Sequence, residues 1–179
     1  MKPTTEQQNV IDFISAADKD EIVLIDAVAG AGKTSLLTEI VKQVPHTRGI
    51  YIAYNKSVAL EAATKFPSSI ACSTVHSLAY RAVVKALGLK VGNFSYRDVT
   101  EKIPYEEKLD ILDTVKEFCL SSHTDIEEYA EAAGLSPGQL SLSTKYLNLM
   151  YEGKIECSHD FYMKAFHMHL ADGSVTYPK

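Results

Sequence analysis

The stretch of the sequence with the clearest chemical meaning is AVAGAGKT, residues 27–34. It follows the apolar run EIVLI and precedes SLLTEIVKQV, whose apolar spacing predicts a helix. The ending GKT matches the phosphate-loop pattern G-x-x-x-x-G-K-[ST], although Ala27 stands where that pattern has its first glycine. In such loops, backbone N–H groups at a helix N-terminus surround a phosphate. The stretch therefore predicts a nucleotide-phosphate site.

The residue types of this loop divide the work of binding a nucleotide. Two glycines let the backbone turn without a Cβ clash. Lys33 would neutralise the β- and γ-phosphates of ATP, and the Thr34 hydroxyl would bind Mg²⁺, so we predict a catalytic part for both. The predicted nucleotide-binding residues of the loop are Ala29, Gly30, Ala31, Gly32, Lys33, Thr34 and Ser35. The plainer alternative is a glycine-rich turn with a surface lysine.

Side chains that can bind metal ions gather near the C-terminus, at Cys157, His159, His167 and His169. On a helix His167 and His169 would point about 200° apart, so sharing one metal would be difficult. We therefore expect no zinc site there. The neighbouring aromatic side chains are expected in the core rather than at a base-stacking surface; they are Phe161, Tyr162 and Phe166.

Three short apolar runs, residues 22–27, 50–54 and 69–73, are rich in strand-forming residues and each leads into a segment with helical spacing. This alternation is typical of a parallel α/β sheet. The three helical stripes run through residues 36–44, 58–66 and 79–87, ended by Pro45, Pro67 and Gly88. The loop and its helix would thus belong to the first of three βα units.

The pattern after residue 92 is helical. Apolar spacing predicts helices around residues 111–119, 124–133, 141–151 and 159–170. Thr124 and Glu127 have capping-box spacing, Gly134 is a stop signal, and the SPG turn at 136–138 precedes the third helix. We predict an α/β part at 1–92 and a small all-helical part at 93–179.

Charge is distributed unevenly along the chain. Residues 1–92 carry ten Lys and Arg against eight Asp and Glu, whereas residues 93–179 carry eight against fifteen. Contacts with nucleic acid are therefore expected in the first part. The three widely spaced cysteines argue for a reducing compartment, and the sequence has no signal peptide or membrane-length apolar run, so we predict a cytoplasmic protein, or one of the nucleoid or a phage host's cytoplasm.

Three further stretches give a resemblance when read with the loop: TTEQQNVI before it, YIAYNKSVALEAATKFP on the second unit, and CSTVHSLAYRAV on the third. In order and spacing, over roughly residues 3–85, they resemble the N-terminal motifs of superfamily 1 DNA helicases of the UvrD/Rep type, in wording nearest to the F-box DNA helicase group and related phage or bacterial enzymes. Ala27 is expected in that family. The resemblance implies a P-loop NTPase fold of RecA type, domain 1A, followed by a helical 1B insertion.

The resemblance also implies roles for single residues. Gln7 matches the glutamine that reads adenine, for which an amide offers a donor and an acceptor; Thr4 and Gln7 also have capping-box spacing, so the local alternative stays open. The implied contacts with single-stranded DNA are Tyr54, Asn55, Lys56, Thr74, His76 and Ser77. One departure is that Ala53 replaces the aromatic that many relatives carry before Thr-Asn-Lys. Thr74 and Ser77 have helix capping as their alternative role.

ATP hydrolysis also needs an acidic pair after a later strand and, commonly, an arginine finger. No apolar strand ending in Asp-Glu follows residue 34, and neither Asp26 nor Glu127–Glu128 fits. The expectation is therefore the front part of a longer protein. The resemblance implies that this protein is an ATP-dependent DNA helicase or translocase, of 3′ to 5′ polarity by its family, with its pathway left open between repair, recombination and phage replication. Its partners would be single-stranded DNA and the rest of the helicase polypeptide, including a second motor domain. The 179-residue chain alone is expected not to hydrolyse ATP.

Two other classes of function stay open. The chain could be a complete helicase-like protein that binds single-stranded DNA or a partner without catalysis. The chain could also be a small P-loop kinase. Such a kinase usually needs basic residues in its lid, and this class fits poorly because residues 93–179 are acidic and hold one arginine, Arg97.

Overall fold

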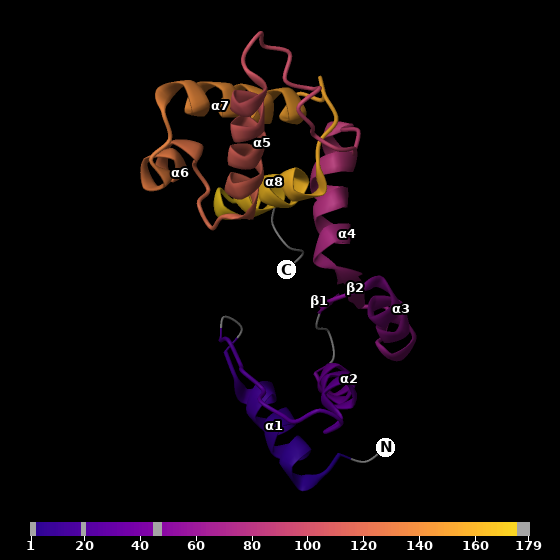
Figure 1. Cartoon of the computed structure of the whole chain (residues 1–179). Helices are drawn as coiled ribbons and strands as arrows, with labels where there is room; N and C mark the ends of the chain where they lie inside the picture. The colour runs from indigo at the N-terminus through magenta and orange to yellow at the C-terminus, as the bar shows by residue number, and fades with distance from the viewer. Residues whose placement is uncertain (1–2, 19–20, 45–47, 175–179) are drawn as a thin grey trace. The chain divides into compact units, whose positions relative to one another are not determined.

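The computed structural model describes residues 3–18, 21–44 and 48–174, which form two compact units. The first unit ends at Val75 and the second begins at His76. The elements in chain order are α1 (Thr5–Ala16), α2 (Lys33–Gln43), β1 (Gly49–Ala53), α3 (Lys56–Lys65), β2 (Ile70–Thr74), α4 (Val75–Ala79), the π-helix η1 (Tyr80–Lys85), α5 (Tyr105–Leu120), α6 (Ile126–Ala133), α7 (Pro137–Tyr151) and α8 (His159–Ala171) (Figure 1). No helix in the described ranges is long and apolar enough to cross a membrane.

Helices α1 and α2 pack against each other around a small apolar core. Ile11 of α1 and Leu36 and Ile40 of α2 are buried there. The two buried apolar residues of α2 are four residues apart, as the apolar stripe predicts, and Thr38 between them is buried as well. This packing fixes the first turn of α2, which carries the glycine-rich loop, beside α1.

Strands β1 and β2 form a two-stranded parallel sheet. Gly49 pairs with Ile70 and Ala53 with Thr74, so both strands end at the same edge. Helix α3 connects them and buries Ala59 and Ala62. The prediction of parallel strands near residues 50–54 and 69–73 is thereby confirmed.

The predicted strand at residues 22–27 is not formed. These residues carry no β-ladder in the structure, and Ile22 and Leu24 are 95% and 91% exposed. A strand needs a neighbouring backbone to take its N–H and C=O groups, and within the described residues neither β1 nor β2 pairs with this segment. Alternate residues still face inward, and Ile25 packs on the α1–α2 core. The chain is thus a mostly helical α/β protein with a small sheet, and the RecA-like P-loop fold stays a proposal.

The helical unit has a larger core, formed mainly by α5, α7 and α8. Helix α5 packs against both α7 and α8 (Figure 1). Three predicted core aromatic residues of α8, Phe161, Tyr162 and Phe166, are buried, which confirms that expectation. A parallel bridge between Val91 and Cys157 ties the segment after η1 to the start of α8.

Helices α6 and α7 do not begin at the residues that the sequence predicted. Asp125, not Thr124, caps α6, because its carboxylate accepts the N–H groups of Glu127 at 2.6 Å and Glu128 at 3.2 Å. Helix α7 begins at Pro137 rather than near residue 141: Ser136 is the N-cap, proline stands at N1, and Gln139 completes a capping box. Gly134 ends α6 with φ of 68°, as predicted.

The third predicted apolar stripe is displaced by a π-helix. Residues Ala79, Val83 and Val84 are buried, whereas Leu87 is 42% exposed. A π-turn holds more residues than an α-turn, so within η1 the buried face moves along the sequence. Gly88 follows with φ of 67°, which agrees with its predicted place at the helix end.

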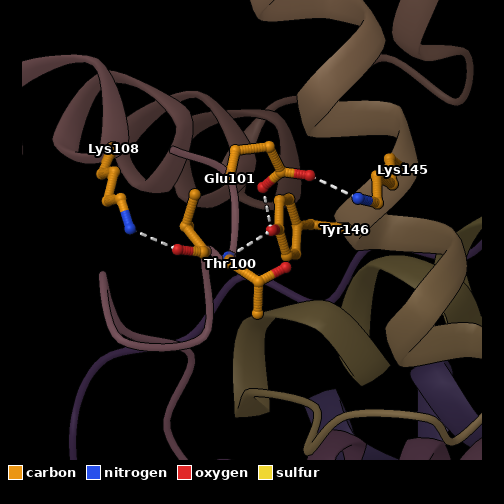
Figure 2. Close-up of polar contacts among 6 residues, drawn as sticks. Thr100, Glu101, Lys108, Lys145 and Tyr146 are labelled. Atoms are coloured by element: carbon orange, nitrogen blue, oxygen red, sulfur yellow. Dashed lines mark hydrogen bonds and ion pairs between the residues drawn. The ribbon is translucent and has the colours of Figure 1, made fainter. Parts of the chain in front are cut away.

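A polar network fastens the segment before α5 to α7 (Figure 2). The Tyr146 hydroxyl accepts the N–H of Thr100 at 2.8 Å and donates to Glu101. Lys145 also donates to Glu101, and Lys108 donates to the carbonyl of Val99 at 2.5 Å. Tyr146 is 1% exposed, so the network joins the core to the surface.

The predicted boundary between residues 92 and 93 differs from the division into compact units after Val75. The second unit therefore contains α4 after its first residue, and η1, in addition to the acidic helical part. The assignment of residues 1–92 to domain 1A and 93–179 to a 1B insertion stays a prediction.

Candidate functional site

The glycine-rich loop turns sharply before α2. Gly30 and Gly32 have φ of 81° and 78°, values that side-chain-bearing residues seldom adopt. Gly32 occupies the N-cap position and supplies no side-chain cap to the N–H groups of the first turn of α2. Open N–H groups at a helix N-terminus favour an anion. The local backbone thus has the features that the phosphate-loop pattern predicts.

The ammonium group of Lys33 folds back over this loop. Its Nζ donates to the carbonyl of Ala27 at 2.5 Å and to that of Val28 at 2.9 Å. The positive charge is therefore held at the loop by neutral carbonyl groups. A phosphate at the same place would exchange these neutral acceptors for charged ones, which are stronger.

A cavity of about 250 Å³ adjoins the loop and α1. Its lining residues are Pro3, Thr4, Gln7, Gly30, Ala31, Gly32, Ser35, Leu36 and Glu39. Five of the predicted nucleotide-binding residues are in this set, whereas Ala29, Lys33 and Thr34 are not. Glu39 was missed by sequence reasoning, and its helical spacing from Ser35 is the signal that could have found it. Its hydrogen bond to Lys42 holds the pKa of the Glu39 carboxyl below the ordinary value.

Gln7 performs the capping role that the sequence left open. Its Oε1 accepts the N–H of Thr4 at 3.1 Å, and its own N–H donates to Thr4 Oγ1 at 3.2 Å. The capping box is therefore confirmed. The same side chain lines the cavity, so capping and nucleotide contact are compatible. Its role toward adenine stays a prediction.

The residues of this site fit a phosphate group. Left-handed glycines, open N–H groups and a lysine at the loop are the donor set that phosphate binding uses. The cavity is smaller than the roughly 300–1,000 Å³ of ordinary ligand pockets, so these residues would enclose part of a nucleotide rather than all of it.

The second group of predicted residues lies where β1 and β2 end. Because Ala53 pairs with Thr74, the segment Tyr54–Lys56 leaves the sheet at the same edge as Thr74. The Tyr54 side chain is 99% exposed, and Lys56 is exposed as well. The Asn55 side chain caps α3 by accepting from Val58 N at 2.9 Å and Ser57 Oγ at 2.8 Å. An exposed ring and an exposed ammonium group can contact a single strand without reading its sequence.

The third group begins α4. Thr74 is buried, whereas His76 and Ser77 are exposed. The His76 ring lies 6.4 Å from the ring of Tyr162 at 88°. The structure therefore fixes the imidazole against the helical unit and leaves it accessible. The capping alternative for Thr74 and Ser77 stays open.

The histidines near the C-terminus have other neighbours. His169 Nε2 is hydrogen-bonded to the Tyr151 hydroxyl at 2.9 Å, and His159 Nδ1 to the Tyr162 hydroxyl at 2.9 Å. In the described part of the chain, no three His, Cys, Asp or Glu side chains gather around a common metal position.

A second cavity, of about 370 Å³, lies within the helical unit between α5, α7 and α8. Phe118, Tyr151, Lys164 and His169 are among its lining residues. Lys164 is 3% exposed, donates to the carbonyls of Ser121 and His123 at 2.8 Å, and has its pKa lowered by burial. None of the predicted site residues lines this cavity.

Comparison with known proteins shows a partial similarity to DNA helicases. The chain is 36% identical over 81 residues to F-box DNA helicase protein 1 of Schizosaccharomyces pombe, and 36% identical over 85 residues to F-box DNA helicase 1 of Gallus gallus. These matches cover 45% and 48% of the chain but 9% and 8% of the relatives, so the chain spans less than a tenth of their length. No protein-family model and no solved structure matches the chain. The comparison therefore shows a partial similarity to F-box DNA helicases over about half of the chain.

Proposed function

We propose that the chain supplies the ATP-binding loop and part of the single-stranded-DNA surface of an ATP-dependent DNA helicase or translocase. The observation that carries this proposal is the similarity to two F-box DNA helicases, at 36% identity over nearly half of the chain. The phosphate-type conformation of the glycine-rich loop supports it independently. The remainder of the motor, with its acidic pair and second motor domain, is proposed as its partner.

The residues at the loop would each contact a different part of the nucleotide. Gly30, Gly32 and the first turn of α2 would present N–H groups to the phosphates, and Lys33 would leave the carbonyls of Ala27 and Val28 to meet their charge. Bound Mg²⁺ would neutralise phosphate charge, with Thr34 as its protein ligand. Gln7 would contact the adenine edge from α1.

The proposed DNA-contacting residues would bind bases and phosphates of single-stranded DNA without selecting a sequence. Tyr54 would present a stacking face to a base, and Lys56 would neutralise a phosphate. Asn55, which lies between them in the chain, would keep its role as the N-cap of α3. Thr74, His76 and Ser77, where β2 continues into α4, would form hydrogen bonds with the DNA backbone.

Binding of a fluorescent ATP analogue with Mg²⁺ tests the nucleotide part of the proposal. Lys33→Ala should weaken binding at least tenfold, because the loop loses its charge-assisted contact to phosphate. Lys65→Ala, which removes an equal charge from the exposed end of α3, should leave binding unchanged. Equal affinities for the two variants would remove the loop from the proposal. The chain alone is expected to release no phosphate, and DNA-stimulated release that disappears in Lys33→Ala would overturn that expectation.

A non-catalytic module that binds single-stranded DNA is the second candidate, because the exposed Tyr54, Lys56 and His76 do not depend on the loop for their accessibility. Under this alternative, Lys56→Ala with His76→Ala abolishes binding, and ATP has no effect on it. Under the helicase proposal the same residues carry binding that ATP–Mg²⁺ changes. Titrating a labelled single strand with and without the nucleotide separates the two.

A further inference from the structure

An aromatic cluster on the helical unit surrounds Tyr162 of α8. The Tyr80 ring lies 6.1 Å from the Tyr162 ring at 84°, and the His76 ring lies 6.4 Å from it at 88°. Both geometries are near-perpendicular ring contacts of the favourable kind. Tyr162 is 3% exposed, and His159 holds its hydroxyl through a hydrogen bond of 2.9 Å. A buried and anchored ring therefore positions two neighbouring rings.

The two positioned rings remain accessible. Tyr80 is 40% exposed, and His76 is also exposed. They stand four residues apart where α4 continues into η1, so they share one side of the helix. Large rings that are held in place but not covered are suited to stacking, because little side-chain freedom remains to be lost on binding.

The segment that carries His76 and Tyr80 is basic in sequence within the otherwise acidic helical unit, and the Asp160 carboxylate of α8 adds one negative charge near Tyr162. Residues 75–90 contain Arg81, Lys85 and Lys90 and no Asp or Glu, whereas residues 93–179 hold fifteen acidic against eight basic side chains. Arg81 Nε donates to the carbonyl of Ser77 at 3.2 Å, which holds its side chain along the helix. A phosphate backbone would meet favourable charge on this segment and repulsion over most of the remaining helical unit.

We propose that Tyr80 forms a further stacking position for an unpaired nucleobase, and that Tyr162 is the residue that positions Tyr80 and His76 for the strand. This inference rests on the proposed single-stranded-DNA function and extends it from the six predicted DNA contacts to Tyr80, later in the same motif stretch, and to Tyr162 of α8. Arg81 and Lys85, on the same segment, would supply positive charge for the phosphates of that strand. The π-turn that begins at Tyr80 agrees with a functional position, since such turns recur at sites of function.

Fluorescence anisotropy with a labelled oligothymidylate, and with an abasic strand of the same length, tests the stacking role. Tyr80→Ala should weaken oligothymidylate binding about tenfold and leave abasic-strand binding nearly unchanged, because the abasic strand keeps its phosphates and has no base to stack. Tyr80→Phe should bind like the parent chain. Leu87→Ala is the matched control, since Leu87 is a non-aromatic residue on the same segment and is 42% exposed, close to the 40% of Tyr80.

The positioning role of Tyr162 has its own readout. The helical content of Tyr162→Leu is first checked by circular dichroism. In this background Tyr80→Ala should reduce oligothymidylate affinity clearly less than it does in the parent chain, because the effects of coupled residues are not additive. Tyr162→Phe keeps the ring and should preserve the full Tyr80 effect. Equal Tyr80 effects in all backgrounds would overturn the positioning role.

The outcomes separate this inference from the proposed function. If Lys56→Ala with His76→Ala abolishes binding while Tyr80→Ala binds both strands like the parent, the stacking position is refuted and the proposed function stands. If the parent chain binds neither strand, both fail together.

Discussion

A Cβ atom on Gly32 would stand 3.3 Å from Nε2 of Gln7, so the amide of α1 lies directly against the glycine that opens α2. The Oε1 atom of the same amide accepts the N–H of Thr4 at 3.1 Å. Gln7 thus joins the start of α1 to the phosphate-type loop. Its orientation, Oε1 toward the cap and Nε2 toward the loop, follows from this pair of contacts.

Comparison of Gln7→Ala with Thr4→Ala separates capping from nucleotide recognition. Each variant removes half of the capping box and should lower the free energy of unfolding by about 1 kcal/mol. Only Gln7→Ala removes the amide beside the loop, so it should weaken ATP binding about tenfold, while Thr4→Ala binds nearly as the parent does. Calorimetric titration with ATP and GTP measures this. Equal losses for the two variants would mean that Gln7 acts only through the helix start.

Asn55 offers a second comparison within one position. Asn55→Asp keeps the side-chain oxygen that caps α3, whereas Asn55→Ala removes it and should cost about 1 kcal/mol in urea unfolding. The aspartate adds a negative charge beside Lys56, so it should weaken single-strand binding although stability is kept. If the charge acts on DNA, Asn55→Asp should therefore be more stable than Asn55→Ala but should bind single-stranded DNA more weakly. An aspartate variant that binds as tightly as the parent would place Asn55 away from the strand.

The local elements were predictable because their signals are local. The stripe of α2 and the left-handed glycines follow from residues within a few positions of each other, and the structure has both. Gly134 ends α6 for the same reason. Where two local signals compete, the pattern does not choose between them: Thr124 has capping-box spacing, but Asp125 reaches two N–H groups.

Pairing between distant segments was less predictable. Residues 22–27 have strand-forming composition, yet a strand forms only when a neighbouring backbone pairs with it, and among the described residues β1 and β2 pair only with each other. The displaced stripe around Val84 depends on a π-turn, which apolar spacing at 3.6 residues per turn does not anticipate.

The candidate site divides in the same way. The loop conformation could be read from the phosphate-loop pattern, but the cavity wall formed by Glu39 and the ring contact of His76 with Tyr162 could not. The second of these joins residues more than eighty positions apart, and spacing along the sequence carries no signal for such a contact.

The three cysteines should differ sharply in reactivity. Cys119 and Cys157 are buried, and burial raises the pKa of the Cys119 thiol to about 12. Cys72 is partly exposed, and its pKa is raised as well. Since the thiolate is the reacting form, accessibility decides the order, and Cys72 should be alkylated first near pH 8. Mass spectrometry after limited iodoacetamide treatment reads the sites. In urea all three should react alike, and rapid labelling of Cys119 without urea would contradict the packing of α5.

The network around Tyr146 should dominate the stability of the segment before α5. Tyr146→Phe removes both the acceptor for Thr100 N–H and the donor to Glu101, which should lower the free energy of unfolding by about 1–3 kcal/mol because two partly buried hydrogen bonds, one of them to a carboxylate, are lost (Figure 2). Tyr105→Phe is the matched control, since Tyr105 is 57% exposed in the same unit. Thermal unfolding of both variants measures the difference, and equal melting temperatures would contradict the role of the network.

Acid should weaken the same network through Glu101. Burial tends to raise the pKa of this carboxyl, but the hydrogen bonds from Lys145 and Tyr146 together hold it below the ordinary value. A group whose pKa is lower in the folded chain stabilises the fold above its unfolded pKa, about 4.3 for glutamate, and loses that contribution as the pH falls through the folded value. Glu101→Gln should therefore unfold more readily than the parent at pH 7, with the difference shrinking below about pH 4. Urea unfolding of both chains across this range checks the prediction, and a difference that does not change with pH would show that Glu101 acts through its shape rather than its charge.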